Sequence, residues 1–248
     1  MIGVEKTYDL TNVEGNNTYF IRNKKGQVLA VHNCGFGTGA KKFRDFAKQM
    51  GVILSEDDSQ MVVQTFRQSH PAITQFWKKC DWVLGQMVAG GQGWFGGPND
   101  NLFYYDGSRV LHGRVVPSIR LPDGNWLHYY GLCVRPKEMP DGSVKMNYCY
   151  LGQKEGRIQW IFTFGARIVE NLVQSYAFAL MKYQALLINK YYRIAGNTHD
   201  EWFITVPEAQ AEQASQYMQW CMVQTPAWAE GLPLDCEGSY AKHYGDCK

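Results

Sequence analysis

The hydrophobic period changes several times along the chain, and this feature constrains the fold more than any other. Residues 1–33 carry short β-type runs separated by turn residues, whereas helical spacing of apolar residues begins at Gly39. Residues 90–160 are rich in glycine and aromatic residues and are divided by turns, and a helical period returns over residues 165–189. The pattern predicts an α+β fold.

The first 33 residues contain too few strands to form a domain alone. Their β-type runs are Lys6–Leu10, Tyr19–Ile21 and Val28–Val31, and no helical period is present. Three short strands bury too little apolar surface for independent stability. We therefore expect residues 1–33 to need a partner.

Helix signals outline the segment that follows. Ser55-Glu56-Asp57-Asp58 resembles a capping box with Asp in place of the usual Glu, and the helix that it opens should stop before His70-Pro71. Gly51 ends the preceding helical run. Helical spacing predicts helices over residues 40–50, 56–69, 73–89 and 165–189.

The composition supports a folded core and excludes several classes of protein. Of 248 residues, 45% are apolar and 19% are charged, so wholesale disorder is not expected. The 25 basic and 23 acidic side chains give a net charge of +2, which excludes a polybasic tail but is compatible with a basic groove. Seven scattered cysteines without a C-x-x-C pair predict neither a disulfide framework nor a cysteine zinc site, and they favour a reducing, cytoplasmic environment.

No membrane segment is expected. The N-terminus MIGVEKTYDL lacks the apolar core of a signal peptide. The most apolar stretch, Leu172–Ile188, is interrupted by Gln174, Lys182 and Gln184 and is too short and too polar to span a bilayer.

The aromatic and histidine residues of the chain favour structural roles. Turn signals at Pro122-Asp123-Gly124 and Pro140-Asp141-Gly142 separate strand-like runs, so the aromatic residues from Trp94 to Tyr130 are expected to pack in strands rather than stack on bases. Four histidines lack a partner at metal-ligand spacing: His70, His112, His128 and His243.

The helix over residues 165–189 has an apolar stripe and a polar face. The stripe runs from Val169 and Val173 to Leu187. The opposite face carries Arg167, Asn171, Gln174 and Phe178. Arg, Asn and Gln in a row can hydrogen-bond base edges or sugar–phosphate oxygens, although a solvated helix face has the same pattern.

An acidic turn follows this helix. The runs Tyr191–Ala195 and Trp202–Val206 flank a turn of five residues or slightly more that contains Asp200 and Glu201. Adjacent carboxylates suit Mg²⁺, which often uses only one or two protein carboxylates, but an ordinary polar turn is the alternative. A two-metal site needs a further carboxylate from elsewhere. Thr205-Val206-Pro207-Glu208 predicts a capping box that opens a helix to Met222, and residues 232–244 predict a final strand and turn.

Several motifs in order resemble family A DNA polymerases of the phage type. Thr198-His199-Asp200-Glu201, a strand and Val206-Pro207-Glu208 are similar to motif C of that family, and residues 164–174 are similar to the preceding helix. Gly35-Phe36-Gly37 is similar to the end of the fingers O helix. Further similar segments are residues 40–43, 66–71, 226–234, 237–238 and 244–245. Residues 34–248 therefore resemble the C-terminal fingers and palm portion of such a polymerase.

This resemblance implies roles only at the matching positions. Asp200 corresponds to the motif C carboxylate that binds Mg²⁺, Glu201 is its less essential neighbour, and His199 lies near the primer terminus. The implied DNA- and nucleotide-binding residues are Phe36, Gly37, Arg167, Asn171, Gln174 and His199. The motif A aspartate and the O-helix Arg and Lys would precede Cys34, so polymerisation needs an N-terminal polymerase fragment as well as primer–template DNA and dNTPs.

Residues 1–33 resemble the C-terminal fragment of a split intein, part of a Hint fold. The similar segments are Thr7–Leu10, Val13–Asn16 and Val28–Cys34. The thiol of Cys34 can accept an acyl group, the side-chain amide of Asn33 can attack its own main-chain carbonyl, and His32 can assist as an acid. Asp9 matches the aspartate of the family, whereas Asn17 stands where the family often has His.

The two resemblances together predict a trans-splicing precursor of the C-terminal part of a DNA polymerase. An upstream half that carries the N-intein would be the splicing partner. The alternative is a non-covalent polymerase subunit whose intein segment only docks the partner, a role that Asn17 favours and the intact His32-Asn33-Cys34 opposes. A DNA-binding protein without catalysis is a third possibility, which the presence of Asp200 disfavours.

Overall fold

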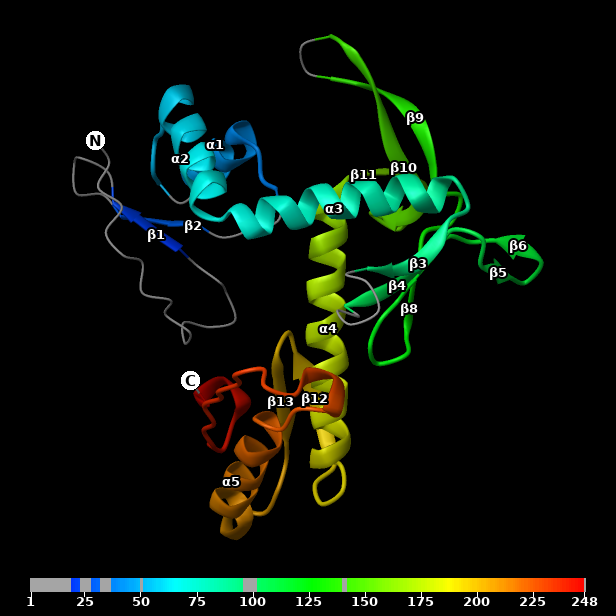
Figure 1. Cartoon of the computed structure of the whole chain (residues 1–248). Helices are drawn as coiled ribbons and strands as arrows, with labels where there is room; N and C mark the ends of the chain where they lie inside the picture. Colours follow the sequence, from blue (N-terminus) through cyan, green and yellow to red (C-terminus); the bar gives the residue numbers. More distant parts are fainter. Residues whose placement is uncertain are drawn as a thin grey trace. The chain divides into compact units, whose positions relative to one another are not determined.

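The computed structural model has two compact units, residues 1–172 and residues 173–248, which are described separately (Figure 1). The structure describes the backbone of residues 19–22 and 28–31, and residues 37–49, 51–95, 102–139 and 142–247 in full. Every strand pairing in these residues is antiparallel, and helices and strands occur in separate stretches. This arrangement agrees with the predicted α+β class.

The N-terminal hairpin contains two of the three predicted strands. β1 (Tyr19–Arg22) pairs antiparallel with β2 (Val28–Val31), with Tyr19 opposite Val31. The third predicted strand, Lys6–Leu10, lies outside the described residues, as do Asp9 and Asn17.

Three helices follow at the predicted positions. They are α1 (Ala40–Gln49), α2 (Glu56–Ser69) and α3 (Pro71–Val88). Phe43 and Ala47 of α1 are buried against Val62 and Val63 of α2, and these four residues form a small core. Gly51 has a φ of 77°, so it supplies the left-handed turn after α1 that a residue with a Cβ rarely adopts.

The start of α2 is capped as its sequence predicts. Ser55 Oγ accepts a hydrogen bond from the backbone N–H of Asp58 at 3.0 Å and donates one to Asp58 Oδ2 at 2.8 Å. A cap of this kind contributes about 1 kcal/mol to helix stability. Pro71 occupies the first turn of α3, where its missing N–H costs no helical hydrogen bond.

A four-stranded sheet in the order β3-β4-β7-β8 follows α3. Its strands are β3 (Gln92–Phe95), β4 (Phe103–Asp106), β7 (Ser118–Arg120) and β8 (Trp126–His128), and a small hairpin of β5 (Val110–Leu111) and β6 (Arg114–Val115) lies between β4 and β7. Phe95 and Phe103 stack with ring centroids 4.6 Å apart, and Tyr104 meets both Trp94 and Trp126 edge-on. The aromatic residues of this segment pack with one another, as predicted.

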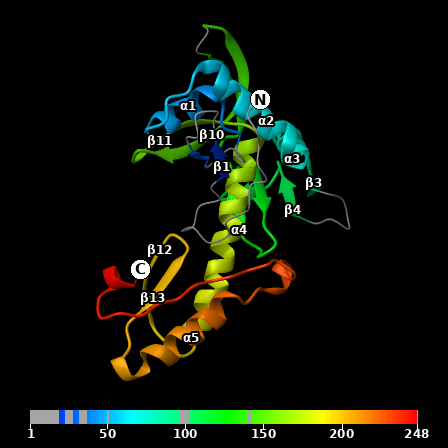
Figure 2. The same cartoon turned by 90° about the vertical axis from the view of Figure 1, so that its left-hand side faces the viewer.

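A second, three-stranded sheet has the order β11-β10-β9. Figure 1 labels all three strands, and Figure 2 shows β10 and β11 from another side. Its strands are β9 (Cys133–Glu138), β10 (Val144–Lys154) and β11 (Arg157–Thr163). Lys154 pairs with Arg157 across a two-residue turn in which Glu155 and Gly156 both have positive φ, the conformation that matches the twist of a hairpin. The side chains of β10 alternate between two faces of the sheet.

The long helix α4 (Gly165–Ile188) ends within one residue of the predicted boundary. Its first residue donates its N–H to Asp81 Oδ1 at 2.6 Å, and a Cβ on Gly165 would overlap the carbonyl oxygen of Trp77. The predicted apolar stripe is only partly correct. Val173 is exposed, whereas the polar Gln184 is buried, where its amide donates a hydrogen bond to the carbonyl oxygen of Met222.

Two predictions for the second unit are wrong. The helix after the acidic turn begins as a 3-10 turn, η2 (Glu208–Gln210), and continues as α5 (Ala211–Met222). Pro207 precedes η2 without a side-chain cap, so the predicted capping box at Thr205 is not formed. Residues 232–243 form no strand, and the short turns η3 (Ala227–Ala229) and η4 (Tyr244–Asp246) are the regular structure of the tail. A lone C-terminal strand would leave its backbone groups without a neighbouring strand.

Among the described residues, no helix is both long and apolar enough to cross a membrane.

Candidate functional site: an acidic hairpin and a polar helix face

The acidic turn is a hairpin with a two-residue connection. β12 (Ile194–Thr198) pairs with β13 (Glu201–Ile204), and Thr198 lies directly opposite Glu201. His199 and Asp200 are therefore the whole turn, shorter than the five residues expected. His199 adopts a φ of 53°, because two-residue hairpin turns need a positive φ to match the twist of their strands.

The two neighbouring carboxylates, Asp200 and Glu201, occupy different parts of the hairpin. Asp200 sits in the turn itself, whereas Glu201 is the first residue of β13 and follows the alternation of that strand. Both side chains are exposed, as is that of His199. Among the described residues, neither carboxylate forms an ion pair.

The donor set at the tip fits a hard cation only in part. Exposed carboxylate oxygens are ligands that Mg²⁺ prefers, and this ion keeps several waters when it binds one or two carboxylates. The described residues contain no cluster of three or more His, Cys, Asp or Glu side chains that could enclose a metal. Asp200, with Glu201 beside it, would therefore have to share an ion with a carboxylate or phosphate supplied by another molecule.

Packing behind the tip holds the hairpin in place. The ring of Phe203 lies over Gly196, so that a Cβ at position 196 would overlap it. Tyr244 of η4 covers the same phenylalanine, with ring centroids 4.7 Å apart. The sequence does not show the contact with Tyr244, because Phe203 and Tyr244 are distant along the chain.

The polar face of α4 divides into half-buried and exposed side chains. Arg167 pairs with Glu170 at 3.5 Å, and Asn171 Nδ2 donates a hydrogen bond to the hydroxyl of Tyr129 at 3.3 Å. Gln174 and Phe178, one and two turns further on, are exposed. Gln174 belongs to the same unit as the acidic hairpin, whereas Arg167 and Asn171 belong to the first unit.

Gly37 packs against the start of α4. It has a φ of 78°, and a Cβ there would lie 2.6 Å from the Cβ of Ala166 and 3.1 Å from the ring of Phe164. Only glycine meets both demands. The other predicted residues of this region, His32, Asn33, Cys34 and Phe36, lie outside the described residues.

Two half-buried histidines and a pair of cysteines have structural partners. His70 Nδ1 lies 2.9 Å from the carbonyl oxygen of Phe66, and His128 Nδ1 lies 2.9 Å from Ser118 Oγ. Burial, aided by the charge of Arg109, lowers the pKa of His128. Cys133 and Cys149 face each other with their sulfur atoms 3.7 Å apart, and burial raises the pKa of Cys149 to about 11.

Comparison with known proteins shows a distant similarity in sequence. The chain is similar to a phage DNA polymerase. It is 26% identical over 206 residues to the DNA polymerase of Bacillus phage SP02, a match that covers 79% of this chain and 29% of the relative. The chain thus spans less than a third of the length of that phage polymerase. No protein-family model matches the chain, and no solved structure matches it.

Proposed function

We propose that this chain supplies the distal fingers and palm portion of a phage-type DNA polymerase. The observation that carries the proposal is the alignment with the phage polymerase over 206 residues. The two-residue hairpin supports the residue assignment, because it presents the exposed carboxylate of Asp200 at its tip.

In this proposal, Asp200 is the principal metal-binding carboxylate and Glu201 assists it. Bound Mg²⁺ would stabilise the charge on the attacking 3′-oxygen and on the leaving pyrophosphate. His199 lies beside the primer terminus. Gln174, with Arg167 and Asn171, contacts the primer–template, and Gly37 with Phe36 lies beside the incoming dNTP.

The N-terminal residues have a separate proposed chemistry, protein trans-splicing. The Cys34 thiolate attacks an upstream thioester and takes over its acyl group, releasing the upstream thiol. The Asn33 side-chain nitrogen then attacks the Asn33 carbonyl, which forms a succinimide and breaks the bond to Cys34. The freed Cys34 amine takes the acyl group from its own sulfur, which leaves a peptide bond. His32 protonates the leaving nitrogen in the cyclisation step.

A second candidate is a non-covalent polymerase subunit in which residues 1–33 only dock the partner. Asn17 favours this alternative, because the residue cannot serve as the acid or base that histidine often provides there. Under this alternative the unspliced complex would itself extend a primer.

One experiment distinguishes splicing from docking. The chain is co-expressed with an upstream polymerase half that ends in an N-intein, and the intact mass of the product is measured. A single larger product that contains residues 34–248 and lacks residues 1–33 would support splicing. A chain that stays at 28.4 kDa with the partner bound would favour docking. Primer extension by the product tests the polymerase proposal in either case, and a product without any extension activity would contradict it.

A further inference from the structure

One face of the three-stranded sheet gathers positive charge over aromatic rings. Residues that lie opposite each other in the β9-β10-β11 register share a face. This side of the sheet also carries Cys133, Cys149, Leu151, Gln153 and Ile158. We call its charged and aromatic part the basic face, formed by Arg135, Lys137, Lys145, Asn147, Trp160 and Phe162. The same face of the three strands carries no carboxylate.

The cations of β9 reach across β10 to the rings of β11. The Arg135 guanidinium carbon lies 3.7 Å from the centroid of Trp160, and Lys137 Nζ lies 5.3 Å from that of Phe162. Such contacts contribute about 0.5–1 kcal/mol each at exposed sites and restrict the motion of the charged groups. They leave the positive charge uncompensated, because an aromatic ring has no net charge.

Two paired lysines, Lys137 and Lys145, add to the excess of positive charge on this face. Lys137 and Lys145 lie directly opposite each other, an arrangement of like charges that destabilises a sheet. The ion pairs of the described residues include neither lysine. An external anion between them would relieve this repulsion.

Both faces of the sheet are covered in part: Cys149, on the same side as the basic residues, is buried, and the opposite side has its own contacts with the rest of the unit. The Tyr148 hydroxyl lies close to Gly85 of α3, so near that a Cβ there would approach it to 3.1 Å, and Tyr150 meets the buried Tyr129 edge-on. Arg135 and Lys145 of the basic face are exposed. The part of the basic face around Arg135 and Lys145 is therefore open to a ligand.

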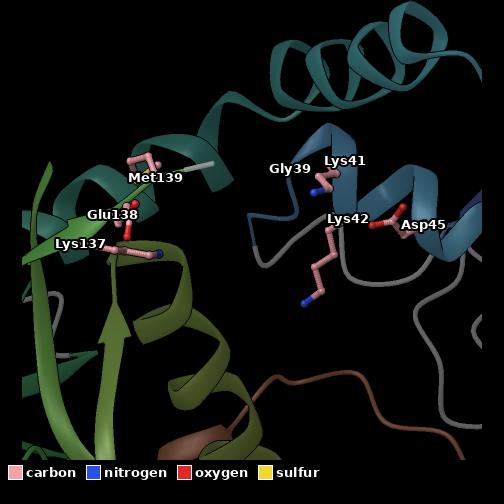
Figure 3. A pocket seen from close by; sticks show the side chains of 7 residues that line it. All are labelled: Gly39, Lys41, Lys42, Asp45, Lys137, Glu138 and Met139. Carbon is pink, nitrogen blue, oxygen red and sulfur yellow. The ribbon is translucent and has the colours of Figure 1, made fainter. Parts of the chain in front are cut away.

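A cleft continues the positive surface. It lies between α1 and β9 and has a volume of about 780 Å³. Figure 3 shows Lys137 extending from β9 and Lys41 and Lys42 extending from α1 toward the same gap. The other residues that line the cleft are Gly39, Asp45, Glu138 and Met139. Three lysines against two carboxylates leave the cleft with one net positive charge.

We propose that the basic face binds single-stranded DNA, with Lys137 and Lys145 on phosphates and the ring-backed guanidinium of Arg135 against a base. Arg135 and Lys137 are two residues apart on β9, a spacing of ~6.8 Å along the strand. A planar guanidinium whose outer side is exposed can stack on an unpaired base, whereas the bases of a duplex are already stacked. The inference rests on the proposed polymerase function, which requires a template strand.

The test is binding of the full chain to a labelled oligodeoxythymidylate of about 16 nucleotides, the upper site size of a small single-strand-binding fold. We expect the double variant Arg135→Gln with Lys145→Gln to bind about tenfold more weakly. Its affinity should also depend less on salt, with the slope of log K against log salt reduced by about 0.7 for the one phosphate contact that Lys145 loses. Equal binding by the variant and the native chain would overturn the proposal.

A matched control removes two positive charges from the other face of the same sheet. Lys154 and Arg157 lie opposite each other and point away from the basic face. We expect Lys154→Gln with Arg157→Gln to bind as the native chain does, and an equal loss in both double variants would overturn the proposal in favour of net charge alone. Thermal unfolding by circular dichroism identifies a variant that has lost its fold, and single Lys145→Gln then replaces the double variant.

Two competitors distinguish the ligand. An abasic oligonucleotide of the same length should bind at least about fivefold more weakly, because stacking on the guanidinium is lost. If polyglutamate of equal charge displaces the oligonucleotide as well as unlabelled DNA does, the face recognises acidic polypeptides and the proposal is wrong. Primer extension is measured separately, so that failure of the native chain to bind the oligonucleotide, with normal primer extension by the reconstituted polymerase, would refute this inference alone.

Discussion

Asn171 donates a hydrogen bond to the hydroxyl of the fully buried Tyr129, 3.3 Å away. The contact joins the first turns of α4 to the end of the four-stranded sheet. Burial raises the pKa of Tyr129, and the hydrogen bond from Asn171 partly opposes this shift. A residue expected on a DNA-binding face thus also satisfies a phenol that lies out of reach of water.

Loss of this contact should therefore destabilise the fold. We expect Asn171→Ala to lower the free energy of unfolding by about 1–2 kcal/mol, because it leaves a buried hydroxyl without a partner. Tyr129→Phe removes the hydroxyl and should cost less. A double-mutant cycle measured by urea unfolding gives the coupling. Purely additive effects would show that the hydrogen bond contributes nothing.

Substitution of the two carboxylates in the acidic hairpin should reduce primer extension to different extents. In the polymerase reconstituted with its upstream half, Asp200→Asn should reduce primer extension at least about a thousandfold, since metal stabilisation of transition-state charge is worth several kcal/mol. Glu201→Gln should reduce it by about tenfold or less. Glu212→Gln, an exposed carboxylate on α5, is the charge-matched control. Equal losses at positions 200 and 201 would contradict the assigned roles.

Gln174 offers a test of the helix face. The side chain is exposed, so Gln174→Ala should leave the free energy of unfolding unchanged. We expect primer–template affinity in the reconstituted polymerase to fall about tenfold, equivalent to one hydrogen bond of ~1.4 kcal/mol. Gln64→Ala on the exposed side of α2 should change neither quantity. If Gln174→Ala leaves the DNA affinity unchanged, this side chain does not contact DNA and the helix face is simply exposed to solvent.

Splicing depends on the residue before the nucleophile. We expect Asn33→Ala to accumulate branched or unspliced product, because alanine has no side-chain amide to cyclise. The matched control is Asn23→Ala, which removes an amide from the same segment and should splice normally. Intact mass after co-expression with the upstream half reads both variants. A normal ligated product from Asn33→Ala would exclude the proposed role.

Alkaline pH should weaken the first unit through Cys80. Burial, and secondly the charge of Asp81, raises the pKa of this thiol from 9.0 to about 12. A group with a raised folded-state pKa stabilises fully below its unfolded pKa and loses that contribution as pH rises toward the folded value. Stability should therefore fall between pH 9 and pH 12.

The size of this effect is measurable by urea unfolding at several pH values. One such group changes the free energy of unfolding by at most about 1.4 kcal/mol per pH unit. Cys80→Ala should flatten the dependence while lowering stability at neutral pH. Ser118→Ala, another buried position, should lower stability without changing the slope. An unchanged slope in Cys80→Ala would assign the alkaline loss to other groups.

Local signals along the chain determined the helices and the existence of the acidic hairpin. Ser55 accepts the hydrogen bond that opens α2, Gly51 takes the positive φ that ends α1, and Pro71 begins α3. Each signal acts within a few residues through backbone sterics or a capping bond, so it is readable without knowledge of the fold.

Tertiary structure alone decided which side chains are free to act. Asn171 meets a tyrosine 42 positions away, Gln184 is buried by a carbonyl 38 positions away, and Val173 of the predicted apolar stripe stays exposed. The basic face is assembled from three strands, with Arg135 on β9, Lys145 on β10 and Trp160 on β11. The periodicity of a helix or strand determines which of its residues share one face. Which other element packs on that face depends on residues that are distant in the sequence.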